Sequence, residues 1–220
     1  MNSTARQTLH QGGPVTPAGS PLNDAQAAMI LLHGRGATAA SILELAPYFA
    51  HPGLAVLAPQ AAGHSWYPYS FLSPLAQNEP WLSSALQAVG ELVTQVEAAG
   101  IPAGRIILGG FSQGACLAAE FAARQPRRYG GLLLFSGGVI GPAGTPRNYP
   151  GSLAGTPVFI GCSDNDSHIP LSRVQETADV LTRLGAQVNQ QIYPQMGHTI
   201  IQAEIDQAQA LVAGLLNHNQ

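Results

Sequence analysis

The feature that most constrains the fold is a series of short apolar runs, each bounded by glycine, proline or another turn residue. Five such runs occupy residues 27–34 (AAMILLHG), 53–59 (GLAVLAP), 105–110 (RIILGG), 131–138 (GLLLFSGG) and 156–161 (TPVFIG). Continuous apolar runs of this length are typical of strands that are buried on both faces. They predict a sheet that runs through the middle of the molecule.

Longer segments with helical spacing separate these runs. They cover residues 41–50, 80–100, 113–126, 170–185 and 204–218, and Pro47 is expected to end or kink the first of them. Pro80 and Pro170 stand at the expected first positions of two helices, and Gly100 and Gly185 stand just past their ends. Because strand and helix alternate, we expect an α/β fold with a mostly parallel sheet and helices on both faces. In such a sheet, functional residues gather beyond the carboxyl ends of the strands.

The chain has 220 residues, a usual size for one domain with one hydrophobic core. We expect a single domain over residues 1–220, in which residues 1–25 form an N-terminal edge segment. This segment is polar and lacks the apolar stretch of a signal sequence. No run approaches the roughly 18 apolar residues that a bilayer-spanning helix needs. The sequence therefore predicts a cytoplasmic protein without a transmembrane segment.

The charge balance excludes one class of partner. Nine Lys and Arg oppose twelve Asp and Glu, a formal net charge of −3, and the chain has no basic cluster. Because a nucleic-acid-binding surface needs such a cluster to neutralise phosphates, we expect no nucleic-acid partner. The two cysteines, Cys116 and Cys162, lie far apart without a CxxC pattern. We expect both to be buried free thiols.

Ser112 lies between two glycines at the junction of a predicted strand and a predicted helix. The sequence GFSQG fits GxSxG, with RIILG before it and QGACLAAEFAA after it. In this context the pattern indicates a nucleophile elbow, a strained turn that exposes a serine hydroxyl above the sheet edge. Gly110 and Gly114 let the strand and the helix approach each other closely. Ser112 is therefore the candidate nucleophile, and a helix-capping serine is the alternative.

A serine nucleophile needs a histidine base, and in this motif the chain order is serine, acid, histidine. His198 follows the strand-like AQVNQQIYP, where the last loop of the sheet would deliver a base. A solvent-exposed loop histidine is the alternative. His33 precedes Ser112, so we expect it to hold the early loop, and we expect His168 to be a surface or pocket residue. No role is assigned to His10, His51, His64 and His218.

Taken in this order, MILLHGRGA (29–37), GFSQGA (110–115) and YPQMGH (193–198) resemble the phospholipase/carboxylesterase family of small α/β hydrolases. This family includes bacterial carboxylesterases and acyl-protein thioesterases. The resemblance covers most of the chain and implies the α/β-hydrolase fold, without a large cap domain. It also implies a catalytic triad that needs no metal or organic cofactor. Dimers are common on this scaffold, so a homodimer is compatible with the resemblance.

The acid of the triad has two candidates in GCSDNDSHIP (161–170). Family members usually show Gly, two residues, the catalytic Asp, two residues, and then Val or Ile, often followed by Pro. Counting from Gly161 selects Asp164, whereas counting back from Ile169 selects Asp166. From Asp166 onward the chain fits the usual strand-helix-strand length without a gap, which favours Asp166. Asp164 remains a near-equal alternative.

The resemblance also implies an oxyanion hole and an acyl pocket. One backbone donor is expected from Gln113 and the other from Arg35, the residue after HG in the early loop. Many relatives have leucine in place of Arg35, whose guanidinium is able to pair with Glu79 or to attract an anionic substrate group. A solvated arginine without a substrate role is the alternative. The expected pocket residues are Trp66, Tyr67, Tyr69, Phe71 and Leu72, with Ile140 added from a second loop.

We therefore expect a serine carboxylesterase that hydrolyses short- to medium-chain carboxylic esters through an acyl-enzyme intermediate. The expected partner is a small-molecule ester. An acyl-protein thioesterase or lysophospholipase is the second interpretation, and a long apolar groove beside Ser112 would favour it. The third interpretation, a hydrolase-fold binding protein without catalysis, is disfavoured because all the triad and oxyanion residues are present.

Overall fold

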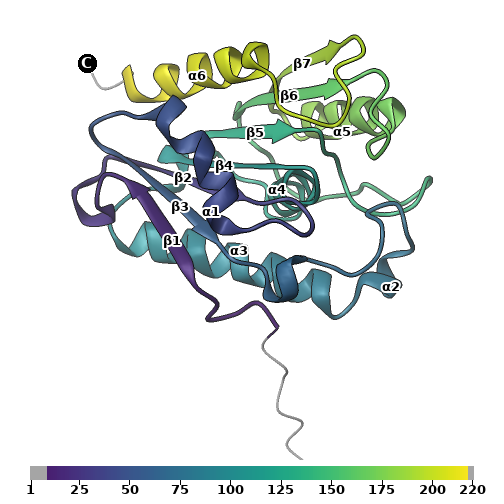
Figure 1. Cartoon of the computed structure of the whole chain (residues 1–220), viewed down its shortest axis with the longest axis horizontal. Coiled ribbons are helices and arrows are strands. Elements are labelled where there is room, and N and C mark those ends of the chain that lie inside the picture. The colour runs from purple at the N-terminus through teal and green to yellow at the C-terminus, as the bar shows by residue number, and fades with distance from the viewer. Residues whose placement is uncertain (1–8, 218–220) are drawn as a thin grey trace, which may run out of the picture.

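The computed structural model describes residues 9–217 and places a seven-stranded sheet between two layers of helices (Figure 1). The strands are β1 (Val15–Gly19), β2 (Ala27–Leu32), β3 (Leu54–Pro59), β4 (Ile106–Phe111), β5 (Gly131–Phe135), β6 (Pro157–Ser163) and β7 (Gln187–Tyr193). They lie in the order β1-β3-β2-β4-β5-β6-β7, and every neighbouring pair is parallel except β1 with β3. The predicted mostly parallel sheet is confirmed.

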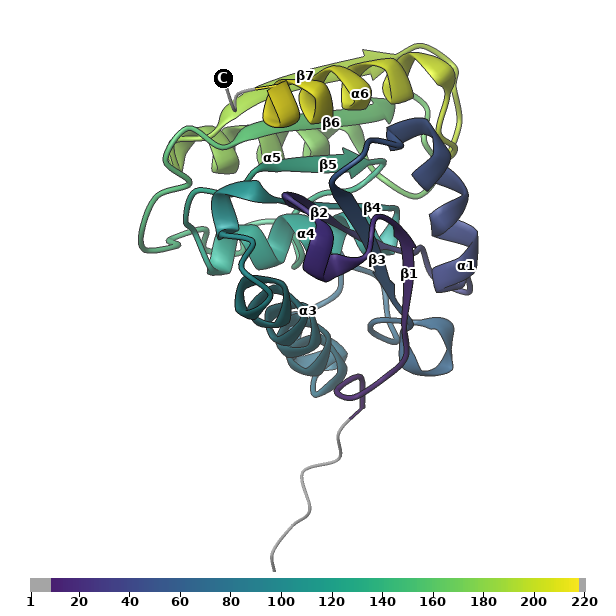
Figure 2. The ribbon, with the colours of Figure 1, turned by 90° about the vertical axis from the view of Figure 1, so that its left-hand side faces the viewer.

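The helices cover both faces of the sheet, as predicted (Figure 2). They are α1 (Ala39–Ile42), α2 (Leu75–Asn78), α3 (Trp81–Ala98), α4 (Gln113–Arg124), α5 (Leu171–Arg183) and α6 (Gln202–Asn217). Side chains of β2 alternate between the faces, which explains its fully apolar sequence. Met29 and Leu31 pack in the cluster that includes α1 and α6, whereas Ile30 and Leu32 pack with residues of α3, α4 and α5.

The helix ends follow the predicted signals closely. Pro80 and Pro170 each lie one residue before the first helical residue of α3 and α5. Gly100 and Gly185 follow the two helices with φ angles of +95° and +82°. These left-handed conformations suit glycine, so the helices end where the sequence predicts.

The segment 41–50, expected to be a helix that Pro47 ends or kinks, folds differently. The single turn of α1 is followed by 3₁₀ turns over Leu43–Phe49. Pro47 lies inside this stretch, and its ring nitrogen has no hydrogen to donate to a continued α-helix. The turn begins two residues earlier than expected because Thr38 and Ser41 exchange side-chain and backbone hydrogen bonds as a capping box.

The expected N-terminal edge segment contains β1, which pairs antiparallel with β3 at one edge of the sheet. Residues 1–8 of this segment lie outside the described residues, as does His218. In residues 9–217, no helix combines the length and the apolar character needed to cross a membrane. Cys116 and Cys162 are both buried and free, as predicted.

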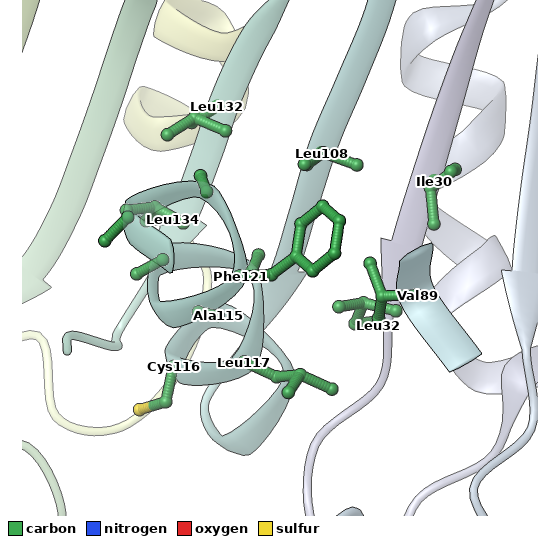
Figure 3. Packing of buried hydrophobic residues seen from close by; sticks show 14 of the residues in the cluster. Ile30, Leu32, Val89, Leu108, Ala115, Cys116, Leu117, Phe121, Leu132 and Leu134 are labelled. Atoms are coloured by element: carbon green, nitrogen blue, oxygen red, sulfur yellow. The ribbon is translucent and has the colours of Figure 1, made fainter. Parts of the chain in front are cut away.

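The turn from β4 into α4 brings the helix very close to the sheet, and two glycines make this approach possible. A Cβ atom at Gly114 would overlap the backbone carbonyl of Leu32, and one at Gly110 would overlap the oxygen of the same carbonyl. Figure 3 shows the packing that results, with Phe121 of α4 beside Leu108 of β4. The start of α4 is thereby held against the sheet. Ser112, the residue before this helix, is held there with it.

Gly114→Ala is expected to destabilise the fold by about 2 kcal/mol, because the overlapping atoms belong to backbone in the middle of the sheet. The measurement is urea unfolding of purified protein. Gly90→Ala in α3 is the control, since its Cβ would lie 3.5 Å from the Phe121 ring, an ordinary contact. That variant should keep or gain stability, by up to about 1 kcal/mol. Equal stability of the two variants would contradict this account of the turn.

Candidate active site

Ser112 lies between β4 and α4 in a conformation that few residues adopt. Its φ and ψ angles are 56° and −118°, and a non-glycine residue in such a region costs on the order of 1–3 kcal/mol. The turn is held by its backbone: the Ser112 amide donates to the Phe135 carbonyl at 2.9 Å, and the Ser112 carbonyl accepts from Cys116 at 3.0 Å. This is the backbone geometry that a nucleophile elbow requires.

Ser112, His198 and Asp166 form a chain of hydrogen bonds at the carboxyl edge of the sheet. His198 Nε2 lies 2.9 Å from Ser112 Oγ, and His198 Nδ1 lies 2.7 Å from Asp166 Oδ2. Ser112 follows β4, Asp166 follows β6 and His198 follows β7, and the carboxyl ends of these strands meet at this edge. In this arrangement the histidine is able to take the serine proton while the carboxylate orients the ring.

The Asp166 carboxyl group is fully buried and well supplied with donors. Its Oδ1 accepts from the amides of His168 and Ile169 at 2.8 and 3.0 Å. Burial opposes ionisation, but the hydrogen bonds from His198 and from these amides outweigh it and lower the pKa of Asp166. Cys162 Sγ lies 3.7 Å from Oδ2. Burial raises the pKa of this thiol to about 12, so it faces the carboxylate as a weak S–H donor.

Asp164, the alternative acid, lies outside this chain of hydrogen bonds. Its Oδ1 accepts from the Gln195 amide at 2.8 Å, and its own amide donates to the Tyr193 carbonyl at 3.2 Å. Asp164 thus ties the loop after β6 to the loop that carries His198. Of the two aspartates, Asp166 is the one in contact with the histidine ring.

Two of the residues near Ser112 have backbone amides without a hydrogen-bond partner among residues 9–217. Gln113 is the first residue of α4, so its N–H has no partner inside the helix. The Arg35 amide, in the turn after β2, has no hydrogen-bond partner among residues 9–217. Both residues line the cavity that also contains Ser112. Free N–H groups in such positions suit the stabilisation of a developing oxyanion.

The Arg35 side chain does not pair with Glu79, one of its expected partners. Its Nη1 donates to the carbonyl of Pro68 at 2.7 Å, and its Nη2 donates to the carbonyl of Tyr69 at 2.5 Å. Glu79 instead accepts a hydrogen bond from the amide of Ser83 at 3.0 Å. The exposed guanidinium therefore fastens the loop after β2 to the loop after β3.

The Gln113 side chain holds the same loop from the other side. Its Oε1 accepts from the Trp66 amide at 2.9 Å, and its Nε2 donates to the Tyr67 carbonyl at 2.8 Å. Segment 65–69 is thus fixed by the side chains of both Arg35 and Gln113. No sequence pattern predicts this clamp, because its hydrogen bonds join Arg35 and Gln113 to a loop that is far from both along the chain.

A cavity of about 530 Å³ opens beside Ser112, a size typical of small-ligand sites. Tyr67, Tyr69 and Phe71 line it, as expected. His168 lines it as well, with its ring centroid 4.6 Å from that of His198. A larger cavity of about 830 Å³ lies between α3 and α4, but it holds no serine–histidine pair among its described lining residues.

Three of the expected pocket residues do not line this cavity. Trp66 is fully buried, and its Nε1 donates to the carbonyl of His33 at 2.9 Å. Ile140 is also fully buried, and Leu72 packs against the core. An aromatic or aliphatic residue in a loop looks the same in sequence whether it faces a cavity or the core.

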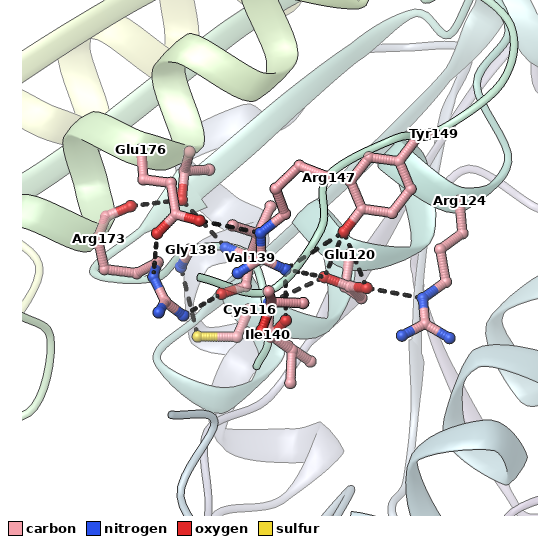
Figure 4. A network of polar contacts seen from close by, with 12 residues as sticks. Cys116, Glu120, Arg124, Gly138, Val139, Ile140, Arg147, Tyr149, Arg173 and Glu176 are labelled. Carbon is pink, nitrogen blue, oxygen red and sulfur yellow. Dashed lines mark hydrogen bonds and ion pairs between the residues drawn. The ribbon is translucent and has the colours of Figure 1, made fainter. Parts of the chain in front are cut away.

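A buried polar network fixes the loop after β5 against α4 and α5 (Figure 4). Glu120 of α4 accepts from the Ile140 amide at 2.8 Å and lies 3.8 Å from Arg147. Arg147 also pairs with Glu176 of α5 at 2.9 Å, and Arg173 pairs with the same carboxylate at 2.8 Å. Since the guanidinium of Arg173 lies over the Phe71 ring, this network supports a wall of the cavity.

His33 holds the early loop, as predicted, and lies outside the hydrogen-bonded chain of Ser112. Its Nδ1 donates to the Gly34 carbonyl at 2.8 Å, and its Nε2 accepts from the Ala61 amide at 3.1 Å. Burial lowers the pKa of His33, so the ring is neutral. His10, to which no role was assigned, is buried between Trp66 and Trp81 and bonds to the Trp66 carbonyl at 3.0 Å.

Glu204 is a fully buried carboxyl group near Asp166. Its Oε2 accepts from the amide of Ile201 at 3.1 Å, at the start of α6. Its Oε1 has no hydrogen-bond partner among residues 9–217 and lies against Gly161. Burial, together with the charge of Asp166, raises the pKa of Glu204 to about 7. Sequence reasoning missed this group, since one Glu in an amphipathic helix normally faces water.

Glu204 should make stability depend on pH between its ordinary pKa of 4.5 and the raised value of about 7. In this window the folded state keeps a proton that the unfolded state releases, so stability falls as pH rises. Glu204→Gln removes the ionisation. Relative to wild type, the variant should gain on the order of 2 kcal/mol between about pH 4.5 and about pH 8, measured by urea unfolding. A difference that does not change with pH would contradict the buried ionisation.

Comparisons with known proteins agree with this geometry. The profile of the phospholipase/carboxylesterase family matches residues 18–215. The structure of a phospholipase/carboxylesterase from Dyadobacter fermentans superposes with a TM-score of 0.88 at 46% identity, and covers 91% of this chain and 96% of that chain. Acyl-protein thioesterase 1 of Eremothecium gossypii is 29% identical over 88% of this chain and 89% of its own length.

A probable carboxylesterase of Oryza sativa is 27% identical over 80% of this chain and 83% of its own length. The family profile spans nearly all the described residues, from β1 to α6. The sheet order, the serine elbow and the absence of a large insertion between described elements fit the same group. This chain belongs to the phospholipase/carboxylesterase family of serine hydrolases with the α/β-hydrolase fold.

Proposed function

We propose that this protein is a serine carboxylesterase that hydrolyses short- to medium-chain carboxylic esters through an acyl-enzyme intermediate, and that residues 1–220 act as one hydrolase domain. The observation that carries the proposal is the hydrogen-bonded chain from Ser112 Oγ through His198 to Asp166, with distances of 2.9 and 2.7 Å. The substrate is a small-molecule ester. The residues of this site supply all the groups that this reaction needs, without a metal or organic cofactor.

In the first half of the reaction, Ser112 Oγ attacks the acyl carbon while His198 Nε2 takes its proton. The amides of Gln113 and Arg35 stabilise the negative charge that develops on the carbonyl oxygen. His198 then gives the proton to the leaving alcohol, and the bond between the acyl carbon and that alcohol breaks. In the second half a water molecule repeats the sequence and releases the acid. Asp166 holds the imidazole in the required tautomer throughout.

The cavity lined by Tyr67, Tyr69 and Phe71 supports binding of the acyl part of the substrate. It contains the proposed nucleophile and both proposed oxyanion donors, so an acyl chain enters it directly from the reacting carbon. Its volume of about 530 Å³ suits a short or medium chain. Trp66 and Ile140 are not part of this proposed site, because neither reaches the cavity.

A second candidate function is hydrolysis of acyl thioesters, which the name of the Eremothecium gossypii relative favours. The same nucleophile, base and oxyanion donors serve an ester or a thioester. Acyl-chain length separates the candidates, because a protein that acts on long acyl chains gains binding energy with each added methylene.

Hydrolysis of p-nitrophenyl esters from acetate to palmitate tests the proposed function. We expect kcat/KM to peak at short or medium chains in the wild type and to vanish in Ser112→Ala. Asp166→Asn should lower kcat by about 10³–10⁴-fold, because the imidazole loses the partner that sets its tautomer.

Asp164→Asn is the matched control, with the same chemical change two residues away. It should retain activity close to that of the wild type, since Asp164 contacts backbone rather than His198. Activity that rises steadily to palmitate would favour the thioesterase candidate. Full activity in Ser112→Ala would refute the proposed mechanism.

Arg35→Met should lower kcat/KM for p-nitrophenyl butyrate by about tenfold, because segment 65–69 loses its hydrogen bonds to the guanidinium while the proposed oxyanion amide remains. Arg35→Lys should restore only part of the loss, since one ammonium cannot reproduce the planar fork. Arg128→Met is the control, because that exposed arginine also binds a backbone carbonyl, of Ala154, but lies away from the site. Equal rates in both Met variants would contradict the positioning role.

A further inference from the structure

A second cavity adjoins the proposed active site on the far side of the histidine. Its volume is about 490 Å³. It shares four lining residues with the first cavity: Gly34, Ala37, Phe111 and His198. Ser112, Gln113 and Arg35 line only the first cavity, so the two spaces meet along the Phe111 and His198 rings, whose centroids are 4.7 Å apart.

The chemistry of acyl transfer requires space in this direction. The tetrahedral carbon carries the serine oxygen, the oxyanion, the acyl chain and the alcohol in four different directions, so the acyl chain and the alcohol extend from it along different paths. His198 Nε2 must reach the alcohol oxygen in order to protonate it. The alcohol therefore begins beside the His198 ring, which is the wall that the second cavity shares with the first.

The walls of the second cavity come from two segments that are distant in sequence. Residues 41–48, from the end of α1 into the 3₁₀ turns after it, contribute Ile42, Leu45 and Tyr48. The loop after β7 and the start of α6 contribute Ile200 and Ile205. Four of these side chains are aliphatic, and the half-exposed Tyr48 ring lies at the rim, while Ser41, Thr199 and His33 add polar groups to the same lining.

Charge restricts the ligand further. The second cavity has no lysine or arginine among the lining residues that the structure describes, and the exposed carboxylate of Glu44 lies in its wall. An anionic alcohol, such as one that carries a phosphate, would be repelled by Glu44 and would find no lysine or arginine to pair with among the described lining residues. The aliphatic wall favours an uncharged, bulky hydrophobic alcohol.

We propose that this second cavity binds the alcohol part of the ester substrate, and that the alcohol is uncharged and bulky, such as a branched, cyclic or aromatic one. The assignment rests on the proposed esterase function and adds the substrate class. In the acylation step the new bond joins Ser112 Oγ to the acyl carbon. The old bond from the acyl carbon to the alcohol oxygen breaks, and the serine proton passes through His198 to the alcohol, which leaves from this cavity.

The test is hydrolysis of methyl, butyl and cyclohexyl acetates, followed by acid release. All three esters give the same acetyl-enzyme, so differences in kcat/KM report only the acylation step, in which the alcohol is still bound. The wild type should prefer cyclohexyl acetate to methyl acetate. Leu45→Trp fills the cavity and should lower this preference by about tenfold or more, with methyl acetate little changed.

Two further variants keep the test decisive. Leu211→Trp is the matched control: Leu211 is also a half-buried leucine packed on the same core cluster, and it lines a cavity of about 490 Å³ away from the site. It should leave the preference unchanged. Tyr48→Ala alters an exposed rim residue that folding tolerates, and it should lower the preference to a smaller extent.

An unchanged cyclohexyl-to-methyl ratio in both Leu45→Trp and Tyr48→Ala, with methyl acetate still hydrolysed, would overturn the assignment of the second cavity. A wild type that prefers methyl acetate would also overturn it. Failure of the proposed function is a separate result: Ser112→Ala would then hydrolyse all three acetates at the wild-type rate.

Discussion

The close contact between α4 and β2 at Gly114 is the constraint on which the rest of the site depends. Because the helix starts against the sheet, Ser112 must turn sharply, and its strained backbone places the hydroxyl in the cavity and the following amide beside it. Loops from other strands then complete the site. The strain is sustained by backbone hydrogen bonds on both sides of the serine and by the apolar packing of α4 over its whole length.

Side-chain contacts between loops convert this rigid turn into a defined site. Asp166 receives two backbone amides besides the histidine, so its carboxylate is held without help from solvent. Asp164 contributes from a neighbouring position by fastening the loop that carries His198. The polar network around Glu120 likewise holds the loop after β5 in place. It does so through ion pairs and hydrogen bonds of charged side chains, where a sheet would use hydrogen bonds between strands.

The fold and the candidate nucleophile could be predicted because their signals are local. Apolar runs mark the strands, and a serine between two glycines marks the elbow whatever the rest of the chain does. The choice between Asp164 and Asp166 depends on the direction of each side chain in one loop, which residue counting does not contain. Trp66 has the same ambiguity, since its ring turns into the core. The second cavity has no sequence signal at all, because residues 41–48 and 199–205 meet only after folding.

The side chains of Arg35 and Gln113 both hold segment 65–69, and both residues line the cavity beside Ser112. A change of either side chain loosens the loop that lines the cavity, although the backbone amide of the residue remains. Substitutions at these positions therefore cannot change the size of the molecule that binds without also changing the rate of turnover. Tyr69 offers a freer route, because its exposed ring borders the cavity while its carbonyl, common to every amino acid, keeps the bond to Arg35. Substitutions that change the substrate specificity of this scaffold should therefore occur first at Tyr69.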